Sequence, residues 1–408
     1  MKNSKHTPQS PLALLDDRDH IGHSSERLLK GEQAQEDYIH AVAFLKSYKG
    51  SQGTFNAYRR EVERLLQWTH LEAKGLKALR REDMEHFIHF CQDPPPSWIG
   101  LKKVPRFIEK NGLRSPNPAW RPFVVTLSKT AHREGHRPLI KNFELSVAST
   151  KEMFAILSSF YTYLMQEDYV VMNPIALIRQ KSQFIRRHQG SPKIRRLSEL
   201  QWQYVMTTVQ GMASIEPAKH ERTLFMMSAL YAMYLRISEL AASARWIPEM
   251  HHFYSDHEGH WWFTTVGKGN KKRQIAVSDP MLAALKRWRT YLGLSALPST
   301  ADKSALFPKT KGKGPITSTT YVRAIVQDCF DRAIIQLKQD GFEEEAGSLV
   351  EATVHWLRHT GISDDVKHRP REHVRDDAGH SSSAITDKYI DIELRDRHRS
   401  AKDKPILD

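Results

Sequence analysis

The sequence predicts a mainly α-helical protein with one small antiparallel sheet in its C-terminal half. Several long stretches repeat apolar residues three and four positions apart, which is the spacing of one helix face. Only the stretch 251–277 follows a pattern of strand, turn and strand. With 408 residues, the chain is long enough for two or three domains.

The first 31 residues are expected to form a tail. The range 1–31 is polar, contains Pro8 and Pro11, and shows no sustained periodicity, so it leaves room for one short helix at most. It also lacks the long apolar run of a secretory signal.

Residues 32–185 are expected to form a helical domain. Helical spacing of apolar residues runs through 38–45, and Ser51 or Thr54 stands where a helix N-cap is expected before the next helix. A further helix is predicted to begin at Ser149 or Thr150.

A proline- and tryptophan-rich region near 93–146 interrupts the helical domain and predicts an inserted, irregular loop. Its basic side chains fit a DNA backbone and a solvated surface loop equally well. These side chains are Lys102, Lys103, Arg106, Arg114, Arg121, Arg133 and Arg137.

A polar, basic stretch predicts an interdomain linker at 186–197, and a second domain is expected over 198–408. A basic linker can cross a phosphate backbone, so its cations and the lysine just before it are candidates for DNA binding. They are Lys181, Arg186, Arg187, Lys193, Arg195 and Arg196. In the second domain, long helices are predicted at 198–210, 219–243 and 317–338.

The charge balance points to a polyanionic partner. The chain has 61 Lys and Arg against 47 Asp and Glu, a formal net charge of +14, which favours nucleic acid over an anionic membrane. No apolar run approaches the roughly 18 residues of a membrane-spanning helix. Two cysteines, Cys91 and Cys329, cannot build a disulfide framework, so a reducing cytoplasm is the simplest compartment.

The stretch 355–389 contains the residue types needed for attack on a phosphodiester. Arg358 can grip phosphate oxygens in a planar fork, and His355 and His380 can transfer protons near neutral pH. The hydroxyl of Tyr389 can attack phosphorus. The alternatives are a packing role for the tyrosine and a turn or cap role for His380.

Two further cations stand upstream. Arg236 can stabilise the extra charge of a phosphorane-like transition state, or simply pair with Glu239 on a helix surface. Lys268, at a glycine-flanked hairpin tip, can protonate a leaving oxygen, or it is a solvated hairpin lysine. The neighbouring Lys271, Lys272 and Arg273 compete for that role and are otherwise candidates for DNA contact.

A metal site is the rival interpretation of the histidines. His355 and His359 are four residues apart, as in zinc-binding helices. No acidic residue lies between them, and the charge of Arg358 would repel a cation. We therefore expect no metal and no other cofactor.

In these motifs the chain resembles the tyrosine recombinase (phage integrase) family. HWLRHTG is similar to the family's H-x-x-R box, and AGHSS followed by ITDKY is similar to its second histidine and nucleophilic tyrosine. ALYAMYLRISELAASA (229–244) resembles the box of the first arginine, and VGKGNKKRQIAV (266–277) the hairpin of the catalytic lysine. The similarity is close across 195–392 and looser across 33–187. The family's usual Thr-Gly before Leu-Arg is Met233-Tyr234 here.

The resemblance implies a helical, SAM-like core-binding domain followed by a mixed α/β catalytic domain. It implies site-specific recombination through a 3′-phosphotyrosine, as in mobile-element integrases, by a homotetramer on double-stranded DNA sites in the cytoplasm, at the nucleoid. Accessory DNA-bending or partner recombinase proteins are also possible. The implied catalytic residues are Arg236, Lys268, His355, Arg358, His380 and Tyr389, with Glu239 orienting Arg236. Type IB topoisomerase-like relaxation, or DNA binding without turnover, stay open as alternatives.

Overall fold

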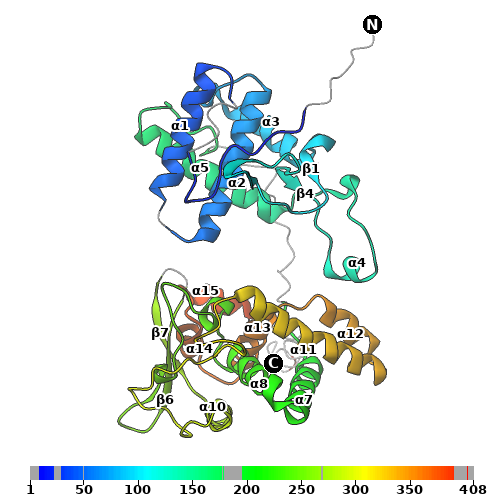
Figure 1. The fold of residues 1–408 in the computed structure, drawn as a ribbon, viewed down its shortest axis with the longest axis vertical. Coiled ribbons are helices and arrows are strands. Elements are labelled where there is room, and N and C mark those ends of the chain that lie inside the picture. The colour runs from blue at the N-terminus through cyan, green and yellow to red at the C-terminus, as the bar shows by residue number, and fades with distance from the viewer. Residues whose placement is uncertain are drawn as a thin grey trace, which may run out of the picture. The chain divides into compact units, whose positions relative to one another are not determined.

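The computed structural model describes residues 9–22, 29–48, 50–176, 178, 195–267, 270–389 and 402. The chain divides into two compact units, unit 1 (Met1–Gly190) and unit 2 (Ser191–Asp408), whose elements are labelled in Figure 1.

Unit 1 is built around a group of helices with an aromatic core. Phe55, Phe87 and Phe160 are fully buried in that core. Ser51 and Ser146 begin two of the helices, because each side chain accepts a hydrogen bond from the backbone N–H three residues further on. Ser146 lies three residues before the predicted helix start near Ser149. The helices are α1 (Glu32–Ser47), α2 (Gln52–Leu71), α3 (Arg81–Gln92) and α5 (Val147–Gln166), with the 3₁₀ turn η2 (Leu76–Ala78).

The prediction of a free N-terminal tail is wrong for residues 9–22. Leu14 and Leu15 are buried in the core of unit 1. Their backbone N–H groups donate to the buried carboxylate of Glu63, at 2.6 and 2.8 Å. The segment is docked by this apolar pair and by hydrogen bonds to its backbone, and it has no periodic pattern from which the docking could be predicted.

The inserted region is more ordered than the irregular loop we predicted. Its elements are η3 (Pro96–Trp98), β1 (Ile99–Gly100), β2 (Phe107–Lys110), β3 (Leu113–Pro116), β4 (Phe123–Val124), α4 (Lys129–Arg133) and η4 (Ile140–Asn142). Strand β1 pairs with β4 in parallel, and β2 with β3 in antiparallel fashion. The reason for this order is aromatic burial, since Trp98, Trp120 and Phe123 are all inside the unit.

Unit 2 is mainly helical, with a three-stranded antiparallel sheet in the order β5 (Phe253–Ser255), β6 (Trp261–Val266), β7 (Lys272–Ala276). Its helices are α7 (Glu199–Ile215), α8 (Pro217–Ala232), α9 (Ile237–Leu240), α10 (Asp279–Tyr291), α11 (Thr319–Gln339), α12 (Glu343–Val350), α13 (Val354–Asp365), α14 (Arg371–Ala378) and α15 (Ser383–Thr386), with the 3₁₀ turns η6 (Met250–His252) and η7 (Asp387–Tyr389). The predicted fold class, mainly α with a small antiparallel sheet, is confirmed.

The helix predicted over 219–243 is interrupted. Helix α8 ends at Ala232, and α9 begins only at Ile237. Between them Tyr234 takes a left-handed backbone conformation, with φ of 49°. Its carbonyl accepts a hydrogen bond from the guanidinium of Arg358, which lies 124 residues further along the chain. This distant contact helps to hold the break, and local sequence spacing does not reveal it.

Helices α8 and α13 approach each other closely at Gly361. A Cβ atom added at Gly361 would lie 2.2 Å from the carbonyl oxygen of Tyr231. Only glycine therefore permits this spacing between the two helices.

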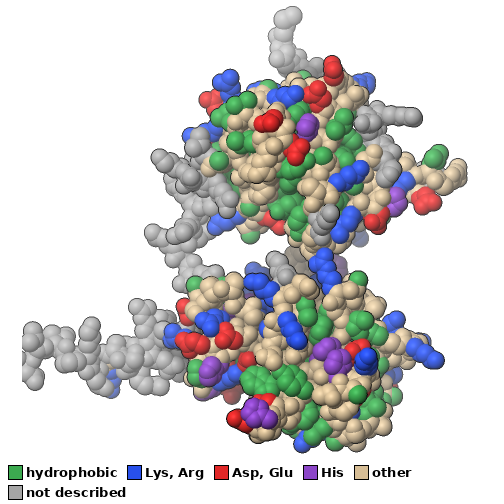
Figure 2. Space-filling model, turned by 90° about the vertical axis from the view of Figure 1, so that its left-hand side faces the viewer, with side chains coloured by type: hydrophobic (Ala, Val, Ile, Leu, Met, Phe, Trp, Pro, Cys, Tyr) green, Lys and Arg blue, Asp and Glu red, His purple; other side chains and the backbone are tan. Residues whose placement is uncertain are grey.

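The charge excess is spread over the surface. On the face drawn in Figure 2, Lys and Arg side chains are distributed over both units with acidic side chains among them. Among the described residues, no helix combines the length and apolar character needed to cross a bilayer.

Candidate active site

Five of the six predicted catalytic residues are described, and they converge in unit 2. Arg236 is the N-cap of α9, and His355 and Arg358 lie on α13. His380 follows the C-terminus of α14, and Tyr389 ends η7. The positive charges of both arginines act on His380 and on Tyr389, so the groups lie within electrostatic reach of one another. Lys268 lies outside the described residues.

Arg358 joins three parts of the site. Its side chain is only 2% exposed. Its two terminal nitrogens donate to the carbonyl oxygens of Tyr234 and, at 2.6 Å, of Ala378. Burial, followed by repulsion from Arg236 and Arg273, lowers the pKa of Arg358 to about 9. The two carbonyl contacts fix the guanidinium in place. Among the described residues, no carboxylate forms a hydrogen bond with it.

Glu239 holds two arginines at once. One of its carboxylate oxygens lies 3.1 Å from Nη1 of Arg236 and 2.7 Å from Nη1 of Arg273. Its other oxygen accepts from the backbone N–H of Arg236 and from Nη2 of Arg273, at 2.9 and 2.8 Å. Burial alone would raise the pKa of Glu239, but the hydrogen bonds from Arg273 and Arg236 hold it below the usual value.

This arrangement changes the prediction for Arg273. We grouped it with exposed hairpin cations that contact DNA, whereas its side chain is only 8% exposed. It donates to Glu239 and to the carbonyl of Asp377 at 2.9 Å, so it links β7 to α9 and α14. Alternation along β7 turns it inward, while Lys271 and Lys272 are exposed as expected.

Tyr389 contacts two histidine rings. Its ring is stacked on His359, with centroids 5.1 Å apart and planes 25° apart, and on His380, with 5.6 Å and 15°. The side chain is buried to all but 8%, and burial raises the pKa of its hydroxyl while Arg358 and Arg236 act to lower it. The tyrosine is therefore positioned by near-parallel contacts with two imidazole rings.

The backbone at the end of α14 orients His380. Gly379 adopts the left-handed conformation, with φ of 64°, and so ends the helix. Nδ1 of His380 then lies 2.9 Å from the hydroxyl of Thr386 in α15. A side chain at position 379 would also collide with Arg273, at 2.8 Å from its Cδ.

The imidazoles are held in their neutral form. Burial and the nearby charges of Arg358 and Arg236 lower the pKa of His380 to about 4. Burial together with His355 and Arg358 likewise lowers the pKa of His359 to about 4. The pKa of His355 is lowered by the same causes, partial burial, Arg358 and Arg236. Neutral imidazoles can accept a proton, which is what a tyrosine nucleophile requires.

His359 was missed as a member of the site. We had considered it only as a metal ligand beside His355, and the two rings do meet edge to face at 4.4 Å. Its Nδ1 is buried and has no hydrogen-bond partner among the described residues. The only sequence signal is its position one residue after Arg358, which does not show on its own that the ring faces Tyr389. In the described part of the chain, no group of three or more His, Cys, Asp or Glu is arranged to hold a metal ion.

The remaining DNA-binding candidates divide between described and undescribed residues. Arg195 is exposed and Arg196 is half-buried. Outside the described residues lie Lys181, Arg186, Arg187 and Lys193.

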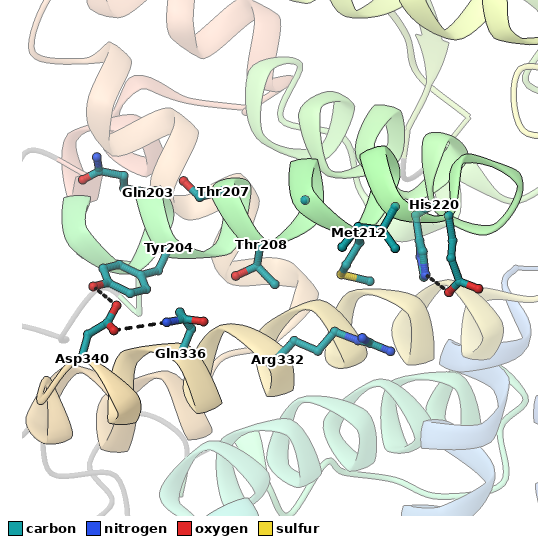
Figure 3. Close-up of a pocket in the computed structure, with 12 residues that line it drawn as sticks. Gln203, Tyr204, Thr207, Thr208, Met212, His220, Arg332, Gln336 and Asp340 are labelled. Atoms are coloured by element: carbon teal, nitrogen blue, oxygen red, sulfur yellow. Dashed lines mark hydrogen bonds and ion pairs between the residues drawn. The ribbon is translucent and has the colours of Figure 1, made fainter.

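A separate groove of about 660 Å³ runs between α7 and α11 (Figure 3). Tyr204 donates to Asp340 across it at 2.7 Å, and Met212 and Ile215 add apolar surface. None of the candidate catalytic residues lines it, so the groove is not part of the site.

The site therefore places one buried tyrosine within electrostatic reach of two arginines, in a mainly helical unit. Residues 195–395 match the model of the phage integrase family, which confirms the resemblance over this region. The chain is 27% identical over 188 residues to a tyrosine recombinase XerC of Alcanivorax borkumensis. That alignment covers 46% of this chain and 52% of the relative, so the chain spans about half the length of the curated relative.

Solved structures share the fold. One is the XerH site-specific recombinase bound to a palindromic difH substrate in a post-cleavage complex. It has a TM-score of 0.56 and 14% identity, covering 97% of this chain and 91% of that chain. Another is the Tn1549 transposon integrase in complex with circular intermediate DNA. It has a TM-score of 0.50 and 14% identity, covering 90% of this chain and 98% of that chain.

Proposed function

We propose that this protein is a site-specific DNA recombinase that cleaves and rejoins duplex DNA through a 3′-phosphotyrosine. The observation that carries the proposal is the convergence of Arg236, Arg358, His380 and Tyr389 in unit 2. Residues 32–185 would act as the core-binding domain, 186–197 as a linker and 198–408 as the catalytic domain.

In the proposed reaction, the Tyr389 oxygen attacks the scissile phosphorus and forms a phosphotyrosine ester as the bond to the 5′ oxygen breaks. His380 or His355, neutral before attack, takes the phenolic proton. Arg236 and Arg358 stabilise the extra negative charge on the non-bridging oxygens. Lys268 protonates the leaving 5′ oxygen. Attack by a different 5′ hydroxyl reverses these steps and releases the tyrosine, so strand exchange needs no external energy source.

The proposed partners are double-stranded DNA recombination sites and three further copies of the chain, with accessory proteins in some reactions. The proposed setting is a mobile element acting at the nucleoid. The XerH and Tn1549 integrase structures contain DNA of this kind, and they share the fold with this chain.

The test is covalent trapping. Tyr389→Phe loses only a hydroxyl, so it should bind DNA recovered from cells expressing the protein as well as the wild type does, and form no adduct on a denaturing gel. Tyr291→Phe, at a tyrosine that is 43% exposed, is the matched control and should form adduct normally. Wild-type levels of adduct in Tyr389→Phe would reject the nucleophile.

The same DNA separates the rival activities. A recombinase exchanges strands between two sites, whereas a topoisomerase-like enzyme relaxes supercoils without exchange. A protein without turnover forms no adduct on a substrate nicked near the cleavage point. Relaxation without recombination, or no adduct at all, would therefore contradict the proposal.

A further inference from the structure

The inserted region of unit 1 contains two halves with opposite character. In the first half, two arginines pair with acids of the unit, Arg106 with Glu63 and Arg114 with Asp16 and Asp17. Aromatic side chains bury themselves there as well. The second half, residues 126–142, is called the arm here, and none of its residues is buried.

The arm is anchored at both ends but projects in between. Val125 is buried just before it, and Phe143 packs edge to face on Phe123 at 5.4 Å just after it. Figure 1 shows α4, which lies within the arm, standing apart from the helices of unit 1.

The arm has local order without a core. Ser128 accepts from the N–H of Ala131 at 3.1 Å and begins α4, and Gly135 turns the chain after it with φ of 78°. A helix of one or two turns is not stable in water by itself. The arm has a defined backbone and no buried side chains. Surface loops of this kind, positioned by a folded domain, often carry binding residues.

The charge of the arm indicates the partner. It contains four Lys or Arg residues and two histidines against one acid, Glu134. That acid lies 3.8 Å from His136. Arg137 and Lys141 are exposed and have no ion-pair partner in the part of the chain that the structure describes. A protein partner would be expected to meet more apolar surface than Leu139 and Ile140 provide, at 48% and 38% exposure.

We propose that the arm binds the phosphate backbone of duplex DNA, with Arg137 and Lys141 as contacts. This rests on the proposed function, because it adds a second DNA contact to a DNA-cleaving protein. Each phosphate contact releases condensed counterions, so it contributes to the salt dependence of binding without reading sequence.

The first experiment measures affinity for a random-sequence duplex at several salt concentrations. The slope of log affinity against log salt is negative, and the double variant Arg137→Gln with Lys141→Gln should make it shallower by about 1.8, at about 0.9 per contact. The matched control, Lys30→Gln with Lys151→Gln, removes the same charge from exposed positions of unit 1 outside the arm and should keep the wild-type slope.

The outcomes are distinguishable. A shallow slope for the wild type itself would contradict the proposed function. A steep wild-type slope that the arm variant retains would overturn the arm proposal alone. If the arm variant keeps its slope and instead loses self-association by light scattering, the arm contacts protein, and the DNA assignment is wrong.

A second measurement places the arm directly. The native cysteines Cys91 and Cys329 are buried, so an iron chelate can be attached selectively at Arg137→Cys. Radical cleavage of bound DNA from position 137, and not from Lys30→Cys, is expected. Equal or absent cleavage from the two positions would overturn the proposal.

Discussion

The candidate active site and the arm both contain basic side chains, but those of the site are largely buried and those of the arm are exposed to solvent. In unit 2, Arg358 and Arg273 are almost fully enclosed, and each nitrogen that reaches a partner is fixed to a carbonyl or to Glu239. In the arm, Arg137 and Lys141 stand in water.

This difference in burial predicts different roles: a buried cation stabilises charge at one fixed point, and an exposed cation attracts DNA phosphates in general. A buried guanidinium interacts with groups at fixed positions, and the strength of these interactions depends little on salt concentration because buried charges are screened much less than exposed ones. An exposed cation attracts any phosphate and weakens as salt rises. Four predictions test how far this contrast holds, from the largest expected effect to the smallest.

Arg358→Lys should have the largest effect. A lysine has a single charged nitrogen, so it cannot donate to the carbonyls of Tyr234 and Ala378 in the same fork. We expect DNA cleavage to fall by about 10² to 10³-fold, the usual cost of a lost transition-state donor, with little change in DNA affinity. Single-turnover cleavage assays measure this. The exposed Arg245→Lys is the control, and an equal loss in both variants would mean that burial makes no difference.

Glu239→Gln should destabilise unit 2 through Arg273. The variant leaves two arginines without their shared carboxylate, and an uncompensated buried charge costs about 3–5 kcal/mol. Thermal unfolding should show the loss, together with slower cleavage. Exposed Glu258→Gln should change neither quantity. Unchanged stability in Glu239→Gln would show that the enclosed ion pairs contribute little.

His359 variants should separate ring contact from proton transfer. If stacking on Tyr389 positions the nucleophile, His359→Phe keeps most of the cleavage rate and His359→Ala loses about tenfold, with DNA affinity unchanged in both. The pH profile of cleavage should be the same for wild type and His359→Phe. Equal losses in the two variants would assign His359 a chemical role in place of a positioning one.

Stability should fall as the solution becomes acidic. The pKa values of His359 and His380 are about 4 in the folded protein and near 6.5 when unfolded. Between these values the unfolded chain binds protons that the folded chain does not, so the free energy of unfolding decreases as pH falls from 6.5 to 4. The slope is at most about 1.4 kcal/mol per pH unit for each imidazole, reduced by partial solvent exposure.

Denaturant unfolding across this pH range measures the slope, and His359→Phe should reduce it. A pH-independent free energy of unfolding would show that neither imidazole is held neutral.

Sequence patterns were sufficient where the determinants are local. The strands around 261–276, the helix beginning near residue 198 and the cap at Ser51, one of two candidates, depend on neighbours a few residues away. The break at Tyr234 was not predictable, because one of its supports is Arg358, far along the chain.

Other features depend on which way a side chain turns. The inward orientation of Arg273 depends on Glu239, and the docking of Leu14 depends on Glu63. Basic or apolar character alone could not distinguish these positions from exposed ones. The ring contact of His359 with Tyr389 is of the same kind.

The close approach of Gly361 to the Tyr231 carbonyl has a consequence for how the site can evolve. The backbone of α13 at Gly361 packs directly against the backbone of α8 at Tyr231, and this contact limits how closely the two helices can approach. Helix α8 leads to Arg236, and α13 contains Arg358, so the contact also limits how closely these two parts of the site can approach. A library randomised at position 361 and selected for the proposed recombination should return glycine alone, because any Cβ atom there would collide with the carbonyl of Tyr231. The separation of the two helices is then held by this one backbone contact, whatever substitutions accumulate on the protein surface.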